Sequence, residues 1–352
     1  MNAAALLREL VAIDSTSSRS NLPILDVLER HARALGLSTR RQAWADKANL
    51  ICSRGGEQGG LALVGHTDCV PFDAAWSGAL APEERGGNLY GRGAADTKAF
   101  LAAALAAASR TSQAPLQLAF TADEEVGCLG ARRLQEEGRL RPRRAIVGEP
   151  TRLIPVLGHK GYCLAEVTVR GAEGHSAFPE TGASAIFAAG RMLGEIERIG
   201  EELKREQDAQ FSPPYTTLNV GLIQGGKAKN VIPGSCAFTL EWRPLPSQEP
   251  EKVLRMVEQL GGAEVKAQRL DRGILQARNS SLVEFLRERS GNEAQTIPFG
   301  TELPYLAALG AEACVFGPGD IRVAHRTGEF VPLQELEKAV EILAAAIEKF
   351  AA

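Results

Sequence analysis

The sequence predicts an α/β protein with a mainly parallel sheet flanked by helices and a second, smaller α+β domain inserted into it. Two changes of pattern along the chain are the basis of this prediction. Short apolar runs alternate with helical stretches over 1–159 and again over 270–352, which favours a parallel sheet. Over 160–269, alternating half-buried strands replace the apolar runs. With 352 residues, the chain also exceeds one typical core.

The larger domain is expected to begin with two amphipathic helices, at 3–13 and 22–35. Three apolar runs after them have the length and continuity of buried strands. They are LALVG at 61–65, LQLAFT at 116–121 and AIVG at 145–148, with helical stretches at 98–110 and 127–137. The pattern resumes near the C-terminus, with helical stretches at 282–290, 304–309 and 333–349 and a short strand at 312–316.

The inserted segment has a strand–helix–strand–strand–helix–strand order, which is typical of a ferredoxin-like sandwich. Its first strand, CLAEVTV at 163–169, alternates apolar and polar residues. The later elements are a helix at 181–207, strands at 216–223 and 235–242, a helix at 250–260 and a strand at 263–269. We therefore expect a self-contained domain between the two parts of the larger one.

Composition describes an ordinary globular protein, with 44% hydrophobic residues, 24% charged residues and a net charge of −3. This near-neutral balance, without a basic stripe, gives no reason to expect nucleic acid as a partner. The N-terminus lacks the basic segment of a signal peptide, and no apolar run reaches the length of a membrane span. The six cysteines are scattered without CxxC spacing, which favours reduced thiols and a cytoplasmic location.

Polar clusters follow the three predicted strands of the first part directly. They are HTD at 66–68, DEE at 123–125 and GEPT at 148–151. Loops at the carboxyl ends of parallel strands build the site in this architecture. The adjacent carboxylates of Glu124 and Glu125 also have a simpler explanation, as a solvated loop that opens a helix. For Asp123 we expect that simpler role, as a solvated or capping acid.

Two imidazoles and several carboxylates without cysteine suit zinc or a similar divalent ion at a catalytic site. The candidates are His66, Asp68, Asp96, Glu124, Glu125, Glu149 and His325. Taken singly, each has another explanation, such as a helix cap at Asp96, an exposed turn at Glu149 or a loop residue at His325. Asp96 begins a helix, and its two oxygens can bridge two ions about 3.5–4 Å apart. Asp68 lies two residues after His66, on the same strand face, where it can orient the imidazole or its surroundings.

Further motifs carry a resemblance to a known family. In the larger domain they are GHTDCVP (65–71), LYGRGAADTKAF (89–100), TADEEVGCLGA (121–131), VGEPT (147–151), GHKGY (158–162), FGTELPYL (299–306) and GPGDIRVAHRTGEFV (317–331). In the inserted domain they are RGAEGHSAFPETGASAI (170–186), GGKAKNVIPG (225–234) and EWRPLP (241–246). With these motifs in order, the chain resembles the M20 metallopeptidase/deacylase family. The resemblance implies a zinc-exopeptidase-like fold whose inserted domain acts as a lid and as the dimerisation surface.

The resemblance also implies a role for each polar residue at the strand ends. The metal ligands would be His66, Asp96 and Glu149 for one zinc ion, and Asp96, Glu125 and His325 for the other. Cobalt can take the place of zinc in such sites. Glu124 would be the general base, and Asp68 would be the acid beside His66. The family often has a cis peptide bond after the bridging aspartate, which here is Asp96–Thr97.

In the inserted domain, His175 would reach across a homodimer into the partner's site, although alone it is explained as a turn histidine. Asn230 and Arg243 match positions that hold the substrate carboxylate, for which an arginine fork is suited. Pairing with a nearby acid also explains Arg243. Lys160 and Thr301 are further candidates for substrate binding.

The implied reaction removes the N-acyl group from an N-acyl amino acid. FGTELPYLAALG and GPGDIRVAHRTGE look most like segments of the family's acetylornithine deacetylases, which implies N2-acetyl-L-ornithine as the substrate, in arginine biosynthesis. Glu302 would attract its cationic side chain, although a helix start also explains an acid there. N-acetylcitrulline and N-succinyl-diaminopimelate are the alternative substrates. A non-catalytic zinc-binding scaffold is the alternative from another class of protein.

Overall fold

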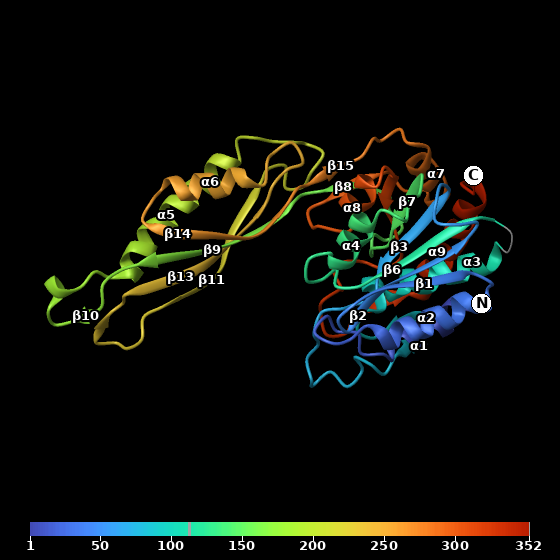
Figure 1. Ribbon diagram of the computed structural model, residues 1–352, viewed down its shortest axis with the longest axis horizontal. Coiled ribbons are helices and arrows are strands. Elements are labelled where there is room, and N and C mark those ends of the chain that lie inside the picture. The colour runs from blue at the N-terminus through green and yellow to red at the C-terminus, as the bar shows by residue number, and fades with distance from the viewer. Residues whose placement is uncertain (112–113, 352) are drawn as a thin grey trace. The chain divides into compact units, whose positions relative to one another are not determined.

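The computed structural model describes residues 1–111 and 114–351, and the chain divides into two compact units (Figure 1). The larger unit comprises Met1–Leu157, Gln276–Gln295 and Thr301–Ala352, and the inserted unit comprises Gly158–Leu275 and Thr296–Gly300. From the sequence, we expect the chain to pass between the two units at 159/160 and 269/270. The chain returns later than that, because strand β14 (Ala263–Asp271) extends further and the short strand β15 (Ile274–Leu275) follows it.

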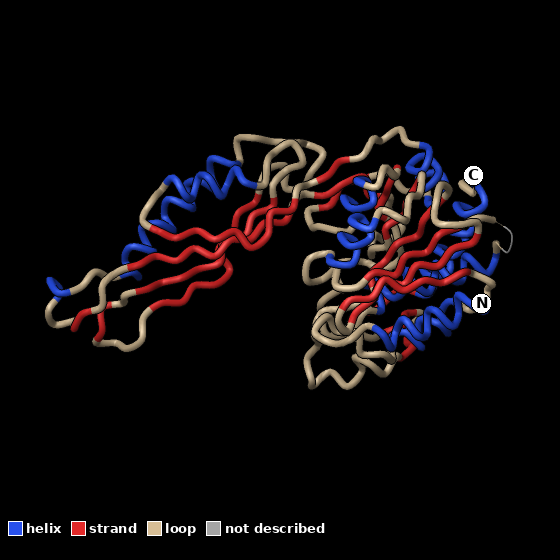
Figure 2. Tube along the Cα trace, in the orientation of Figure 1, coloured by secondary structure: helices blue, strands red, loops and turns tan. Residues whose placement is uncertain are grey.

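Most of a nine-stranded sheet lies in the larger unit, where Figure 2 draws its strands in red. Its strand order is β1-β2-β6-β3-β7-β17-β8-β15, with β16 paired to β8. The central strands β6, β3, β7 and β17 are parallel, whereas β1 and β2 at one edge are antiparallel. The bounds are β1 Ser38–Trp44, β2 Lys47–Arg54, β3 Leu61–His66, β6 Leu116–Thr121, β7 Arg144–Val147, β8 Val156–His159, β16 Gln295–Ile297 and β17 Glu312–Val315. The predicted α/β class is therefore confirmed.

Helices cover this sheet, so β3 and β6 are buried along their whole length. Helices α1, α3 and α9 pack together, and α4 and α8 contact each other beside β2 and β17. The bounds are α1 Ala3–Val11, α2 Leu22–Ala34, α3 Ala99–Arg110, α4 Leu129–Glu137, α7 Ser281–Ser290, α8 Leu303–Ala308 and α9 Leu333–Lys349. The alanine-rich helix α3 is buried over most of its length. Its small side chains let neighbouring elements approach closely.

The antiparallel hairpin β1–β2 is absent from the sequence prediction. Its turn contains Ala45 at a positive φ of 45°, and the side chains of β1 stay mostly half-buried. Arg41 of β1 forms ion pairs with Asp26 and Glu29 of α2, at 2.7 and 2.6 Å. An edge strand of this kind is placed by its pairing with β2 and by tertiary contacts. A period-2 apolar pattern, which sequence analysis relies on, is not needed there.

The inserted unit is a four-stranded antiparallel sheet in the order β11-β13-β9-β14. Helices α5 and α6 share one core with alternate residues of β9 and β13, which confirms the ferredoxin-like order. The bounds are β9 Tyr162–Arg170, α5 Ala185–Leu203, β11 Thr217–Gly225, β13 Ser235–Arg243 and α6 Glu251–Gln259. Helix α5 is shorter than predicted, because Ser184 caps its N-terminus by accepting from the Phe187 amide. The short strands β10 (Gly174–His175) and β12 (Val231–Ile232) form a separate two-stranded antiparallel ladder in the same unit.

Within the described residues, no helix combines the length and apolar character that a membrane crossing needs. All six cysteines are buried and free of disulfide bonds. They therefore act as small core residues, as their scattered spacing predicts.

Candidate metal centre

Three neighbouring parallel strands bring candidate ligands to one edge of the sheet. His66 is the last residue of β3, which lies between β6 and β7. Glu124 and Glu125 come shortly after β6, and Glu149 comes two residues after β7. The convergence that the sequence predicts at the carboxyl ends of these strands is therefore present.

Asp96 reaches the same place from a turn that precedes α3. The Asp96–Thr97 peptide bond is cis, as the resemblance implies. The Thr97 hydroxyl donates to the Gly148 carbonyl oxygen at 3.1 Å, which joins the turn to the end of β7. Gly148 has no room for a side chain, because a Cβ there would lie 2.0 Å from the Phe100 ring. The close packing of Phe100, in α3, against Gly148, just after β7, thus places Asp96.

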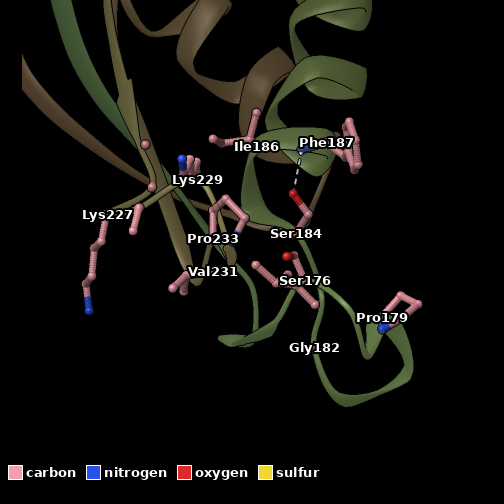
Figure 3. A pocket seen from close by; sticks show the side chains of 14 residues that line it. Ser176, Pro179, Gly182, Ser184, Ile186, Phe187, Lys227, Lys229, Val231 and Pro233 are labelled. Atoms are coloured by element: carbon pink, nitrogen blue, oxygen red, sulfur yellow. Dashed lines mark hydrogen bonds between the residues drawn. The ribbon is translucent and has the colours of Figure 1, made fainter.

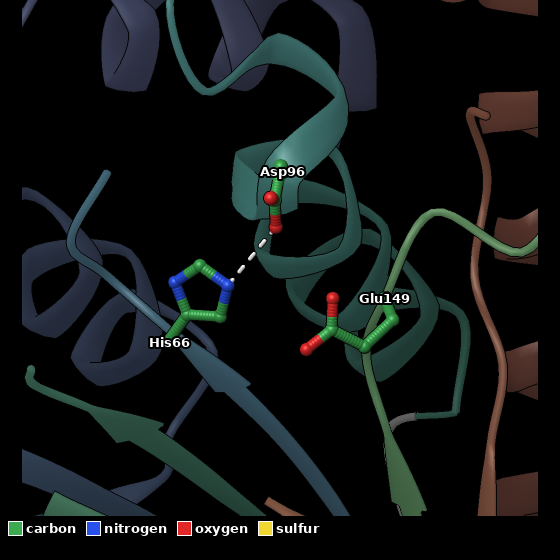
Figure 4. Close-up of side chains that lie close together, drawn as sticks. All are labelled: His66, Asp96 and Glu149. Carbon is green, nitrogen blue, oxygen red and sulfur yellow. Dashed lines mark hydrogen bonds and ion pairs between the residues drawn. The ribbon is translucent and has the colours of Figure 1, made fainter. Parts of the chain in front are cut away.

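His66, Asp96 and Glu149 form the first ligand group (Figure 4). All three are buried, and one ligand atom of each lies within 4.8 Å of the others. His66 Nε2 lies 3.1 Å from Asp96 Oδ1, while His66 Nδ1 lies 2.9 Å from the main-chain oxygen of Asp68. If Nδ1 donates to that carbonyl, the lone pair of Nε2 points toward the group, which is the tautomer that a metal needs.

Asp96, Glu125 and His325 form the second group. His325 Nε2 lies 3.0 Å from Asp96 Oδ2 and 3.1 Å from Glu125 Oε1. Asp96 therefore presents one oxygen to each group. This is the geometry that a carboxylate needs to bridge two cations.

The charge balance of the cluster favours cations. Burial raises the pKa of Glu149 well above its usual value and that of Glu124 to about 8, and neighbouring carboxylates add to both shifts. Burial lowers the pKa of His66, but its hydrogen bond to Asp96 and the nearby acids outweigh this and raise the pKa. The site therefore retains protons unless metal ions replace them. Imidazoles and carboxylates in these numbers fit zinc.

A profile of Peptidase family M20/M25/M40 matches residues 62–349. The chain belongs to this family. The acetylornithine deacetylase of Myxococcus xanthus is 53% identical to it, over 98% of this chain and 97% of that protein. The acetylornithine deacetylase of Pasteurella multocida (strain Pm70) is 33% identical, over 96% of this chain and 94% of that protein.

Solved structures of other proteins share the fold. A tripeptidase from Staphylococcus aureus is 23% identical with a TM-score of 0.81, covering 99% of this chain and 98% of that chain. An M20 family metallo-carboxypeptidase from Sulfolobus solfataricus is 18% identical with a TM-score of 0.83, covering 100% and 99%. At these identities the likeness establishes the architecture alone.

The Asp68 carboxylate contacts the surroundings of His66 more closely than the imidazole itself. The distance from its Oδ1 to His66 Nδ1 is 3.7 Å, which is long for a hydrogen bond. The carboxylate instead accepts from the main-chain amides of Glu124 and Glu125 at 3.0 and 3.3 Å, and from the Ser17 hydroxyl at 2.7 Å. Its main-chain oxygen holds His66. Asp68 thus orients the two glutamates and the histidine through different atoms.

Asp123 is not the solvated acid that we expected. It is buried, takes a positive φ of 58° and pairs with Lys47 at 2.7 Å. Burial raises the pKa of its carboxyl, and Lys47 only partly opposes that shift. The Lys47 ammonium also donates to the Ser17 carbonyl oxygen at 2.7 Å. The ion pair therefore anchors the start of the loop that carries Glu124.

Glu329 and Arg92 are assigned no role by the sequence analysis, although both lie in quoted motifs. Glu329 Oε1 accepts from the Ala95 and Asp96 amides at 2.9 and 3.1 Å. Its other oxygen pairs with Arg92 Nη1 at 2.6 Å, and both side chains are buried. The pair therefore holds the backbone of the bridging aspartate. One sequence feature could have identified Glu329 as a residue of the site. It lies four residues after His325 in the same motif.

Replacing Glu329 with glutamine should weaken metal binding by about 10–100-fold, because a neighbour that orients a ligand is lost and Arg92 keeps a buried, uncompensated charge. Calorimetric titration of Zn²⁺ into metal-free protein measures this affinity. Glu337→Gln removes the acid of the exposed pair with Arg110 and is the matched control. Unchanged affinity in a folded Glu329→Gln protein would contradict the assignment.

Two candidates of the inserted unit lie together at one of its ends. His175 pairs in register with Val231, and the amide of Ser176 donates to the main-chain oxygen of Asn230 at 3.1 Å. His175 is exposed, and its Nδ1 accepts from the Ala177 amide at 3.1 Å. In the neutral ring, Nε2 then carries the proton and can donate it to a ligand.

Arg243 and Lys160 belong to another part of the inserted unit. Arg243 ends β13, and its Nε donates to Glu241 Oε1 at 2.8 Å, so pairing with a nearby acid, the alternative explanation, is present. Lys160 is buried, and its ammonium donates to the Tyr215 carbonyl oxygen. Burial lowers the pKa of Lys160 to about 8. A substrate contact by either residue remains a prediction.

Thr301 and Glu302 lie at the start of α8, in the larger unit. The Thr301 hydroxyl accepts from the Leu303 amide at 3.2 Å and so begins the helix. Glu302 is 1% exposed, and among the described residues no well-formed hydrogen bond reaches its carboxylate. Burial raises its pKa to about 7, although the nearby Thr121 hydroxyl and His66 oppose this. A substrate cation would have to reach it from within the site.

Proposed function

We propose that this chain is a two-metal amide hydrolase that releases acetate and L-ornithine from N2-acetyl-L-ornithine, a step of arginine biosynthesis. The observation that carries the proposal is the 53% identity, over 98% of the chain, to the acetylornithine deacetylase of Myxococcus xanthus. The two ligand groups that share Asp96, with Glu124 beside them, support the reaction class. Six buried cysteines without disulfide bonds support a cytoplasmic location.

The two ligand groups would each hold one divalent ion, zinc or, as a substitute, cobalt. His66 and Glu149 would bind one ion, Glu125 and His325 the other, and Asp96 both. When bound, such ions polarise the amide carbonyl and lower the pKa of water towards about 7. Their charge would also relieve the repulsion between the buried carboxylates.

Glu124 is the proton carrier in this proposal. It takes the proton of the attacking water and passes it to the nitrogen of the leaving amine. Its main-chain amide is held by Asp68, and the Cys128 thiol donates to its Oε1 at 3.4 Å. The side chain is thereby directed while Glu125, with its own amide on the same aspartate, serves as a ligand.

The inserted unit would supply groups that bind the substrate. Arg243 and Asn230 would hold the α-carboxylate, and His175 would donate from Nε2 to the oxygen on which negative charge develops. His175 and Asn230 lie beyond Ser235 at one end of β13, whereas Arg243 lies at the other end. The length of that strand is about 26 Å at about 3.3 Å per residue.

This separation within one unit supports a homodimer. No N-acyl amino acid is long enough to contact both ends of β13 at once. If one substrate molecule contacts His175 and Asn230 as well as Arg243, then Arg243 must come from one copy of the chain and the other two residues from a second copy. The proposed active site is therefore completed by the inserted unit of a partner.

Apolar side chains on the inserted unit offer a surface for that partner. Ile186 and Phe187 at the start of α5, and Leu222 and Ile223 on β11, are exposed. Figure 3 shows Ile186 and Phe187 beside a pocket of about 790 Å³ that the β11–β12 loop also lines. Because β11 is an edge strand, its backbone can pair with a strand of a second copy.

A substrate panel tests the proposed function. With Zn²⁺ or Co²⁺ added, we expect hydrolysis of N-acetylornithine with a kcat/KM well above those for N-acetylcitrulline, N-succinyl-diaminopimelate and N-acetylmethionine. N-acetylcitrulline is close in shape to N-acetylornithine and keeps its carboxylate, but its side chain is uncharged, so it isolates the contribution of the cationic side chain. Metal content is measured alongside.

Glu302→Gln is expected to narrow the preference for N-acetylornithine over N-acetylcitrulline about tenfold, because a buried carboxylate that attracts the substrate ammonium is neutralised. The ratio of the two kcat/KM values measures this effect. Equal loss on both substrates would mean that Glu302 acts on the catalytic groups instead. A wild-type protein inactive on the whole panel would favour the zinc-binding scaffold.

A further inference from the structure

Two arginines from neighbouring strands stack on one tyrosine in the inserted unit. Tyr162 begins β9, the strand between β13 and β14. The guanidinium carbon of Arg243, from β13, lies 3.9 Å from the centre of its ring. That of Arg269, from β14, lies 4.6 Å from it. These distances are well inside the range of favourable cation–π contact.

Each arginine is also tied to a carboxylate two residues away on its own strand. Arg243 donates through Nε to Glu241 at 2.8 Å, and Arg269 donates through Nε to Asp271. Residues two apart face the same side of a strand, so all four charges share the face that carries Tyr162. The carboxylates offset the repulsion between the guanidiniums.

This face of the sheet is the one that the helices leave uncovered. Cys163, Ala165 and Val167 alternate with Tyr162 along β9 and lie in the core under α5 and α6. Tyr162 itself is half-buried, and the Arg243 side chain is 25% exposed. Among the described residues, the hydrogen bonds of Arg243 run through Nε, so its two terminal NH2 groups stay available for a ligand.

We propose that Tyr162 is a positioning residue that holds the guanidinium of Arg243 ready for the substrate α-carboxylate. The inference rests on the proposed function, which assigns that contact to Arg243. A long arginine side chain loses rotamer freedom when it binds a ligand, and this loss weakens binding. The Tyr162 ring holds the guanidinium plane of Arg243, and Glu241 holds its Nε. Arg243 therefore loses its rotamer freedom when the protein folds, before the substrate binds. The two NH2 groups then form the fork that fits a carboxylate.

The test compares Tyr162→Leu with Tyr162→Phe, which keeps the ring face and removes only the hydroxyl. We expect Tyr162→Leu to raise KM for N-acetylornithine about tenfold with kcat within about threefold of wild type, and Tyr162→Phe to restore the wild-type KM. Trp44→Leu removes a similar stack, with Arg133 at 4.6 Å from the ring centre in the larger unit, and should leave KM unchanged.

A substrate without the carboxylate separates positioning from a general structural effect. N-acetylputrescine has the amide and the cation of N-acetylornithine but no carboxylate. Wild type and Tyr162→Leu should therefore have the same kcat/KM on it or, if turnover is too slow to measure, the same inhibition constant for putrescine. L-ornithine, which keeps the carboxylate, should inhibit the Leu variant more weakly than wild type.

Arg269→Gln gives a second route if Tyr162→Leu does not fold. It removes the other guanidinium from the ring and should raise KM for N-acetylornithine about two- to threefold, without affecting N-acetylputrescine. An unchanged KM in a folded Tyr162→Leu protein, or equal losses on both substrates, would overturn the proposal. If wild type hydrolyses a different N-acyl amino acid, the proposed substrate is wrong. The KM values of wild type and Tyr162→Leu are then compared on that other substrate, and they test the role of Tyr162 in the same way. Inactivity on every N-acyl amino acid would count against both.

Discussion

Replacing Glu124 with glutamine is expected to lower kcat on N-acetylornithine by about 10²–10⁴-fold while both metal sites stay filled. Glutamine matches the shape of the buried side chain and can still accept from the Cys128 thiol, so the loop should keep its fold. It cannot take the proton of the attacking water. The measurement pairs steady-state kinetics with metal analysis of the purified protein.

The neighbouring residue is the matched control for this prediction. Glu125→Gln changes the same chemical group one position along, but Glu125 Oε1 lies 3.1 Å from His325 Nε2 in the second ligand group. We therefore expect it to lose metal from that site, with activity partly restored by excess Zn²⁺. Near-normal turnover in Glu124→Gln, or metal loss in both variants, would refute the division of roles.

His175→Ala should lower kcat by about 10²–10³-fold, because a donor to the developing negative charge is removed. The stronger prediction concerns a mixture of His175→Ala with Glu124→Gln chains. If His175 acts on the partner's site, a mixed dimer has one site with both residues intact. Random exchange of subunits should then restore about a quarter of wild-type activity, because about half of the dimers are mixed and each has one complete site.

The control for this exchange is a mixture of Glu124→Gln chains with chains that carry both substitutions. None of the resulting dimers has a complete site, so activity should stay at the level of the separate variants. The same absence of recovery in the His175→Ala mixture would show that His175 serves its own chain. Light scattering should establish the dimer in both experiments.

Much of the candidate site was predictable because its ligands follow buried strands directly. An apolar run that ends in His66, or is followed closely by Glu125 or Glu149, marks the carboxyl end of a strand in the sequence itself. Adjacent parallel strands bring such ends to one edge of a sheet, whatever the details of their packing. For the same reason, the order of strands and helices predicted the core elements of both units, but not the β1–β2 hairpin.

The surroundings of the ligands could not be predicted in this way. Asp68 and Asp123 are both aspartates next to candidate ligands in the sequence. Asp68 accepts from the main-chain amides of the two glutamates, whereas Asp123 pairs with Lys47. Glu329 contacts the amide of Asp96 from 233 positions away in the chain. Nothing local to these residues indicates which partner the fold will bring to them.

By itself, the sequence determined the α/β class, the inserted ferredoxin-like unit and the set of candidate ligands, whose division into two groups came from the family resemblance. The local pattern of each element specifies the class and the unit, because apolar periodicity depends on neighbours in the chain. Only the tertiary structure decided that Asp96 presents one oxygen to each group, that Asp68 holds Glu124 and Glu125, and that two arginines stack on Tyr162. Those contacts depend on side-chain positions at distances of a few ångströms between segments far apart in the chain. The packing of whole elements sets such positions.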